Sequence, residues 1–442
     1  MPALDTTTEQ PLAAGRPASA LSPSLAARYR EVRGFSERLC EPLVAEDYVI
    51  QSMADVSPTK WHLAHTSWFF ETFVLTPHLP GYQPFHADFT YLFNSYYNAV
   101  GERHCRPKRG LVSRPTVAET YAYRAHIDKS MLELLESADE PLLRELTPLV
   151  TLGCHHEQQH QELMVTDIKH VFTMNPLRPI YRDRAPVGAG LPAPTRWVIY
   201  SEGLHWVGHE GRGFCFDNEG PRHREFLQPF AVASRLVTNG EFQEFVADGG
   251  YARPELWLSM GWATACEHGW KAPFYWEERD GRPWHMTLAG MRPVEAAEPV
   301  CHVSYFEADS YARWAGARLP GEAEWEVAAD GIPIEGNFVE NGHYHPVPAT
   351  DAPAHSRAQE NPLQQMFGDV WQWTRSQYTP YPGYSPPAGA LGEYNGKFMC
   401  NQFVLRGGSC ATSRSHIRHT YRNFFPPDAC WQFTGIRLAK DI

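Results

Sequence analysis

The sequence predicts an α+β protein in which a bundle of helices is followed by a second, loop-rich domain. Apolar residues recur at three-to-four spacing from residue 24 to about residue 175, as they do along the buried faces of packed helices. The pattern changes after residues 186–194, where short apolar runs are broken by glycine and proline. The 442 residues are enough for two or three domains with buried cores.

Four helices account for most of the first part. They are expected at residues 25–43, 59–75, 117–138 and 141–173. Four such segments within about 150 residues are typical of an antiparallel bundle, whose core can hold a metal ion between facing helices. The connection over residues 76–116 is long for a compact domain, and loops of that length often carry function.

The expected domain bounds follow from these changes of pattern. A disordered start rich in Pro, Ala, Ser and Thr covers residues 1–23, the bundle 24–185, a linker 186–196 and the second domain 197–442. Helical pieces of the second domain are expected near residues 239–247 and 307–315, and most of the 14 tryptophans fall in this domain.

Composition disfavours several classes of function. With 39 basic and 51 acidic residues the net charge is −12, which argues against nucleic-acid and membrane partners. The start lacks the basic and apolar regions of a signal peptide, and no apolar run is long enough to span a bilayer. Nine cysteines without a C-x-x-C pair indicate free thiols, so we expect a cytoplasmic protein. The sequence leaves the oligomeric state open.

The strongest local signal is the run HHEQQH at residues 155–160, on the last predicted helix of the bundle. His156 and His160 are four residues apart and therefore project from the same face of that helix. His65 shares a predicted helical face with Trp61, and a bundle can bring it opposite the other two. A lone histidine on an apolar face is usually a core residue, but the three together favour a metal site.

Spacing alone leaves two kinds of metal chemistry open. His156-Glu157-x-x-His160 matches the zinc metalloprotease signature, in which the glutamate is the general base. The longer metzincin motif would need Gly at 163 and His at 166, where the chain has Leu163 and Thr166. Three nitrogen ligands with open positions suit zinc with water, or Fe(II) with a substrate and dioxygen.

Taken together, the motifs resemble a known family. Residues 61–65 (WHLAH) and 156–162 (HEQQHQE) are similar to motifs of the iron-dependent sulfoxide synthases of ergothioneine biosynthesis. In that family a DinB-like four-helix bundle precedes a formylglycine-generating-enzyme-like domain with a C-type-lectin-like fold. The second half carries further matching motifs in order, at residues 216–223, 237–242, 318–326, 368–374, 405–409 and 435–439.

The resemblance implies a reaction and a set of site residues. It implies Fe(II) held by His65, His156 and His160. The implied reaction uses dioxygen to join L-cysteine to C2 of the imidazole of Nα-trimethylhistidine (hercynine) and to oxidise the sulfur to the sulfoxide. Gln159 is expected to contact the hercynine imidazole and Asn423 its carboxylate, since an amide offers a donor and an acceptor without charge.

Two features indicate the subtype. Relatives that use γ-glutamylcysteine carry an Asp and an Arg where this chain has Phe425 and Ala429, and leaving an amino-acid head group unpaired there would cost several kcal/mol. L-Cysteine is therefore the expected thiol, with Phe424 and Phe425 lining its site. The run Asn94-Ser95-Tyr96-Tyr97-Asn98 resembles the second type of the family, in which such a pair supplies the catalytic phenol.

A phenol beside the iron could deliver a proton or hydrogen atom and favour C–S coupling over oxidation of the thiol alone. Only one member of the pair Tyr96 and Tyr97 is expected to act, because neighbours in sequence seldom both face a site. The basic run over residues 103–114 is either a solvated loop or a carboxylate clamp, for which Arg106 and Arg109 are the candidates.

Three other functions are weighed against this one. The nearest is an ovothiol-type synthase, which couples cysteine to C5 of unmethylated histidine. A zinc hydrolase follows from the literal H-E-x-x-H motif. A non-enzymatic binding module built on the second fold is the third. No flavin or 2-oxoglutarate motif is visible in the sequence.

Overall fold

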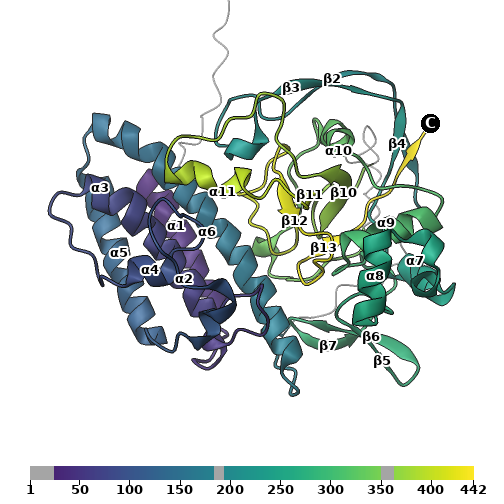
Figure 1. The fold of residues 1–442 in the computed structure, drawn as a ribbon, viewed down its shortest axis with the longest axis horizontal. Coiled ribbons are helices and arrows are strands. Elements are labelled where there is room, and N and C mark those ends of the chain that lie inside the picture. Colours follow the sequence, from purple (N-terminus) through teal and green to yellow (C-terminus); the bar gives the residue numbers. More distant parts are fainter. Residues whose placement is uncertain (1–23, 184–193, 350–362) are drawn as a thin grey trace, which may run out of the picture.

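The computed structural model describes residues 24–183, 194–349 and 363–442. The helical part, residues 24–183, lies beside the second part, residues 194–349 and 363–442 (Figure 1). The strands of the described residues belong to this second part. The disordered start expected at residues 1–23 lies outside the described residues, as does most of the expected linker, residues 186–196. The domain bounds stated above therefore stay predictions.

Helices occupy the four segments where the sequence predicts them. The helical part contains α1 (Leu25–Cys40), α2 (Thr59–Phe70), α3 (Thr76–His78), α4 (Phe89–Phe93), α5 (Val117–Ser137) and α6 (Glu140–Met174). A π-helical turn, Glu71–Leu75, joins α2 to α3, so the predicted helix over residues 59–75 is continuous. α1 packs against α6, and α2 packs against both α5 and α6. This packing places one face of α2 opposite one face of α6.

The longest helix, α6, lies between the two parts of the molecule (Figure 1). Asp139 caps its first turn by accepting a hydrogen bond from the backbone N–H of Leu142 (3.0 Å). Gly153 allows α6 to approach α2 closely, because a Cβ at this position would lie 2.4 Å from the ring of Phe70. His156 follows one turn later, so this close approach sets the distance from His156 to α2.

The second part is built from short strands and short helices. Its strands are β1 (Trp197–Tyr200), β2 (Gly203–Val207), β3 (His223–Leu227), β4 (Phe230–Ala233), β5 (Trp276–Arg279), β6 (Arg282–Thr287), β7 (Gly290–Pro293), β8 (Gly336–Asn337), β9 (Phe367–Gly368), β10 (Trp371–Gln377), β11 (Phe403–Arg406), β12 (Asn423–Phe425), β13 (Thr434–Gly435) and β14 (Ala439–Asp441). Its helices are α7 (Asn239–Ala247), α8 (Ser259–His268), α9 (Tyr305–Trp314), α10 (Glu322–Ala329) and α11 (Glu393–Gly396). These strands form sheets of two to four strands, which confirms the predicted α+β class.

The predicted helix over residues 307–315 begins earlier than expected. α9 starts at Tyr305 because Ser304 and Glu307 cap each other's backbone N–H groups, which satisfies two donors of the first turn. The predicted helix over residues 239–247 is found with those bounds as α7.

One sheet edge faces the helical part (Figure 1). β12 forms the edge of the sheet β12-β11-β10-β13 and pairs antiparallel with β11, so that Asn423 lies opposite Leu405. Two buried arginines, Arg406 in β11 and Arg422 just before β12, bind the carboxylate of Glu322 at the start of α10 (2.9 and 2.7 Å). These ion pairs hold the edge strand in place.

Glu162 attaches α6 to this sheet. Its half-buried carboxylate accepts hydrogen bonds from the Trp371 indole (2.7 Å) and from the hydroxyls of Ser409 (2.6 Å) and Thr412 (2.7 Å). The motif that carries the histidines thus also carries the contact that aligns α6 with the second part.

Two further sequence expectations concern cysteines and membranes. All nine cysteines are free thiols, as expected. Among the helices of the described ranges, none is both long enough and apolar enough to cross a bilayer.

Candidate metal centre and substrate cavity

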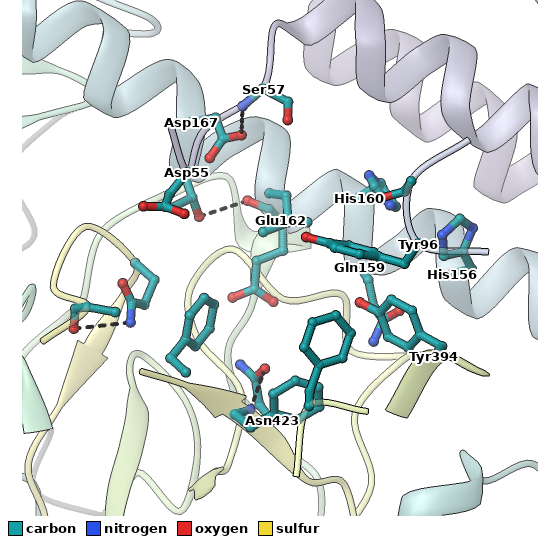
Figure 2. Close-up of a pocket in the computed structure, with 18 of the residues that line it drawn as sticks. Asp55, Ser57, Tyr96, His156, Gln159, His160, Glu162, Asp167, Tyr394 and Asn423 are labelled. Carbon is teal, nitrogen blue, oxygen red and sulfur yellow. Dashed lines mark hydrogen bonds between the residues drawn. The ribbon is translucent and has the colours of Figure 1, made fainter. Parts of the chain in front are cut away.

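A cavity of about 420 Å³ lies between the helical part and β12. Figure 2 shows Tyr96, His156, Gln159 and His160 gathered on one side of it and Asn423 on the other. The structure brings every site residue predicted from the sequence to this lining: His65, Tyr96, Tyr97, Arg106, Arg109, His156, Gln159, His160, Asn423, Phe424 and Phe425.

Three histidines converge at the helical wall of the cavity. His65 from α2 and His156 and His160 from α6 each offer one nitrogen, and these atoms all lie within 4.8 Å of one another. The Nε2 atoms of His65 and His156 are 3.2 Å apart. Such a set of converging nitrogens is suited to a single divalent metal ion.

The three imidazoles are in the protonation state that binds metals. Burial and the neighbouring imidazoles hold the pKa of His65 and of His160 well below the ordinary value, and burial lowers the pKa of His156 to about 4. All three rings are therefore neutral near pH 7, with a lone pair available for a metal.

The ring of His65 is fixed by its surroundings on α2. It stacks on Trp61 with ring centroids 4.7 Å apart, and it also stacks on Trp68. Its Nδ1 lies 2.6 Å from the carbonyl oxygen of Phe93, to which it donates. This bond leaves Nε2 as the nitrogen that faces the other histidines.

Glu157 follows His156 in the chain but points away from the cavity. Its fully buried carboxylate accepts hydrogen bonds from Ser36 (2.6 Å), Arg33 (3.0 Å) and Arg124 (2.6 Å). Although burial acts to raise its pKa, the Arg124 and Arg33 guanidiniums lower the pKa to about 2. A carboxylate held in this way cannot serve as the general base of a zinc hydrolase, which needs that glutamate beside the metal-bound water.

Both tyrosines of the pair line the cavity, although only one was expected to face it. The reason is a turn closed by Asn94, whose side chain accepts from the N–H of Tyr97 (3.1 Å) and donates to its carbonyl oxygen (3.0 Å). Tyr96 accepts a hydrogen bond from Arg106 through its hydroxyl (2.5 Å). Tyr97 is buried against Trp68, and this burial raises the pKa of its phenol well above the ordinary value, so it stays protonated.

Arg106 and Arg109 make their hydrogen bonds to uncharged groups. The guanidinium carbon of Arg109 lies over the ring of Trp61, 3.3 Å from its centroid, and the guanidinium donates to the Ser57 hydroxyl (2.9 Å). Burial and the neighbouring Arg106 lower the pKa of Arg109 to about 9. The Nε atoms of both arginines are buried and lack a partner within the described residues. Two guanidiniums without a bound carboxylate thus line the cavity, where an anion would balance their charge.

The opposite wall carries the predicted amide and aromatic residues. The side-chain oxygen of Asn423 accepts a hydrogen bond from the backbone N–H of Phe424, the next residue of β12 (2.9 Å). Phe424 stacks on Tyr378, with ring centroids 4.0 Å apart. Across the cavity, Gln159 donates to the hydroxyl of Tyr421 (2.8 Å).

Sequence reasoning missed several residues of the lining. Tyr421 has no motif of its own, and Tyr394 and Phe398 come from the segment around α11, which lacks a recognisable pattern. Trp371 and Glu162 lie within motifs that carry the family resemblance, but neither was expected to line the site. A signal existed for Glu162, because it lies three residues after Gln159 and therefore beside it on the surface of α6.

A second buried group also brings three possible ligand atoms within 4.8 Å: His285, Glu298 and His345. None of the three lines the cavity described above. His345 and Glu298 are already hydrogen-bonded to each other (2.9 Å), as expected of a polar pair within a core.

Both parts of the chain match known families. Residues 28–164 match the DinB superfamily, and residues 194–442 match the sulfatase-modifying factor enzyme 1-like domain. These matches confirm the predicted combination of a DinB-like bundle with a formylglycine-generating-enzyme-like domain.

Relatives match nearly the whole chain. The hercynine oxygenase of Mycolicibacterium smegmatis is 31% identical over 415 residues, which cover 88% of this chain and 92% of the relative. The hercynine oxygenase of Mycobacterium tuberculosis is 32% identical with the same coverage. The formylglycine-generating enzyme of Streptomyces coelicolor is 30% identical and matches only 58% of this chain.

Proposed function

The chain belongs to the hercynine oxygenase family, and we propose that it acts on hercynine in ergothioneine biosynthesis as a sulfoxide synthase. The family membership confirms the resemblance found in the sequence and identifies an oxidoreductase. It disfavours the ovothiol-type synthase, the zinc hydrolase and the binding module. The observation that carries the proposal is the set of three neutral histidine nitrogens that converge on a cavity lined by the predicted substrate residues.

The metal proposed for this site is Fe(II). Three neutral imidazoles without a carboxylate ligand form a donor set that binds Fe(II) and leaves positions open on the cavity side. When bound there, Fe(II) supplies the redox chemistry by which dioxygen reacts with the two organic substrates. Forming the C–S bond and oxidising the sulfur remove four electrons in all. These reduce one dioxygen, with one oxygen atom in the sulfoxide and the other in water.

The proposed thiol is L-cysteine. The guanidiniums of Arg106 and Arg109 line the cavity without a bound carboxylate and can hold the cysteine carboxylate in a fork geometry. Phe425 and Ala429 offer no charged group to a γ-glutamyl extension. On the other wall, Gln159 and Asn423 would orient the imidazole and the carboxylate of hercynine.

The tyrosine pair supplies the phenol in this proposal. Because the Tyr96 hydroxyl already accepts from Arg106, its own proton is free to be donated into the cavity. Tyr97 lines the same cavity, and its phenol stays protonated. A phenol so placed would deliver a proton or hydrogen atom during C–S coupling.

The choice of thiol is tested with anaerobically iron-reconstituted protein. Hercynine is supplied with either L-cysteine or γ-glutamylcysteine under air, and products are followed by mass spectrometry. Cysteine should turn over faster. Faster turnover of γ-glutamylcysteine would overturn the choice of thiol while leaving the oxygenase assignment intact.

The role of the phenol is tested by product distribution. Tyr97→Phe, or failing that Tyr96→Phe, should divert product from the sulfoxide towards cysteine sulfinate. Each variant serves as the matched control for the other, since each removes a single hydroxyl from the same wall. An unchanged product ratio in both variants would rule out the tyrosine role.

A further inference from the structure

The three proposed metal ligands differ in what holds their second ring nitrogen. Nδ1 of His65 donates to a backbone carbonyl, and Nδ1 of His160 lies 2.8 Å from Nδ1 of His62. Nδ1 of His156 is buried and has no hydrogen-bond partner in the described parts of the chain. Within the described ranges, His160 alone of the three is bonded to another titratable side chain through this nitrogen.

The contact of His160 continues to a carboxylate. Nε2 of His62 lies 3.0 Å from Oδ2 of Asp167, and all three side chains are buried. The same carboxylate oxygen accepts from the backbone N–H of Ser57 (2.8 Å), the bond drawn in Figure 2. His62 comes from α2, whereas Asp167 and His160 come from α6, so the series crosses the two helices that carry the metal ligands.

The order of donors and acceptors in this series is fixed by its chemistry. An ionised carboxylate only accepts, so Nε2 of His62 must carry the hydrogen that lies between it and Asp167. With that hydrogen on Nε2, the lone pair of His62 Nδ1 accepts from Nδ1–H of His160, 2.8 Å away. That tautomer of His160 leaves the lone pair on Nε2, the nitrogen a metal needs.

From this series, and on the basis of the function proposed above, we infer that His62 and Asp167 are positioning residues for the metal ligand His160. They fix its tautomer and ring orientation, and the carboxylate strengthens its donation to the metal through two hydrogen bonds. His65 has weaker support from a carbonyl oxygen, and His156 has no such partner among the residues that the structure describes. The site therefore holds three histidines of unequal donor strength, with His160 the strongest.

Three substitutions separate the effect of the His160 ring orientation from the effect of the Asp167 charge. His62→Ala removes the acceptor for His160. His62→Gln keeps an acceptor oxygen for Nδ1–H of His160 and an N–H donor for Asp167, but replaces the imidazole ring between them with an amide. Asp167→Asn keeps the shape and the hydrogen bonds and removes the negative charge. The matched control is His170→Ala, a buried histidine one turn after Asp167 on α6 that bonds Ser52 (2.6 Å) and does not line the cavity.

The primary measurement is the Fe(II) dissociation constant of each folded variant, obtained by competition with a chelator. His62→Ala and Asp167→Asn should weaken Fe(II) binding about 10–100-fold, as other losses of such outer hydrogen bonds do, and His62→Gln should weaken it less. His170→Ala should lower stability without changing the iron affinity. The Fe(III)/Fe(II) potential should rise in Asp167→Asn, because a less electron-rich imidazole stabilises the oxidised metal less.

A role limited to packing predicts another result. Metal-free variants would then unfold at lower temperature, while the iron affinity and the electron paramagnetic resonance spectrum of the nitrosyl complex would match the parent protein. That result in Asp167→Asn, and in His62→Ala if this variant folds, would overturn the inference. Asp167→Asn is close to isosteric, so it supplies the answer even if His62→Ala does not fold. If wild-type protein binds no iron at all, the proposed function fails instead.

Discussion

The two walls of the cavity are built in opposite ways. The helical wall takes its three histidines from regular turns of α2 and α6, and buried hydrogen bonds hold the second nitrogen of two of these rings. The opposite wall takes Asn423, Phe424 and Phe425 from a three-residue edge strand, and much of the rest from loops and the short helix α11. The difference indicates a division of labour, in which the rigid wall fixes a metal and the irregular wall adapts to the substrate.

The largest effect on the helical wall is expected from His156→Ala, which removes one of the three proposed metal ligands. Loss of one of three ligands should abolish iron binding and lower turnover by more than about 100-fold, since losses of outer hydrogen bonds alone cost about 10–100-fold. Iron content and oxygen consumption check the result. The control is His285→Ala in the second part, which should keep its iron. Loss of iron in that control, with retention in His156→Ala, would place the metal elsewhere.

Glu157→Gln tests whether the helical wall also depends on the buried charges behind it. Replacing this carboxylate leaves Arg33 and Arg124 without their shared partner and should lower the free energy of unfolding by about 3–5 kcal/mol. Denaturant unfolding of the metal-free protein measures the change. Glu37→Gln is the control, because its contact with Arg124 is half-exposed and should contribute under about 1 kcal/mol. If Glu157→Gln kept full stability but lost a hydrolytic activity, the result would instead favour the zinc hydrolase as the function of the protein.

The same contrast explains how much the sequence could predict. The helices of the first part and the histidine set follow from spacing, because a helix places residues four apart on one face. The pairing of Asn423 with Leu405 could not be predicted, since it joins segments whose register depends on the whole sheet. Tyr394 belongs to a segment without periodicity, so its place in the cavity depends on packing alone.

The placement of both Tyr96 and Tyr97 in the cavity could not be predicted from the local sequence pattern. An extended backbone would have turned Tyr96 and Tyr97 to opposite sides, which is why only one was expected to face the site. The side chain of Asn94 instead closes a turn, and both rings reach the cavity. Asparagine often closes such turns, but a turn beside a metal site is not visible from its sequence alone.

Arg109→Gln tests whether the arginines bind the carboxylate of the cysteine substrate. Loss of a charge-assisted bond to the substrate carboxylate should raise KM for cysteine about 10–100-fold, with a smaller change in kcat. Steady-state kinetics with cysteine as the varied substrate check this. Arg103→Gln is the matched control, because Arg103 bonds the backbone of Ser95 and does not line the cavity. Equal effects in both variants would contradict a specific clamp.

The smallest expected effect comes from the irregular wall. Combining Phe425→Asp with Ala429→Arg should give a several-fold gain in the use of γ-glutamylcysteine relative to cysteine, because a charged pair could then hold the glutamyl head group. Competition between the two thiols, followed by mass spectrometry, measures the ratio. The single variant Phe425→Asp is the control, and an unchanged ratio in the double variant would show that these positions do not choose the thiol.

The central claim is that the three-histidine site couples a thiol to hercynine with dioxygen. It is tested most directly by oxygen consumption and product mass spectrometry on the purified iron form, with isotopically labelled dioxygen. The account predicts one dioxygen consumed for each hercynylcysteine sulfoxide formed, with one labelled oxygen atom in the product. Turnover by the zinc form, or cysteine sulfinate as the sole product of the iron form, would contradict it.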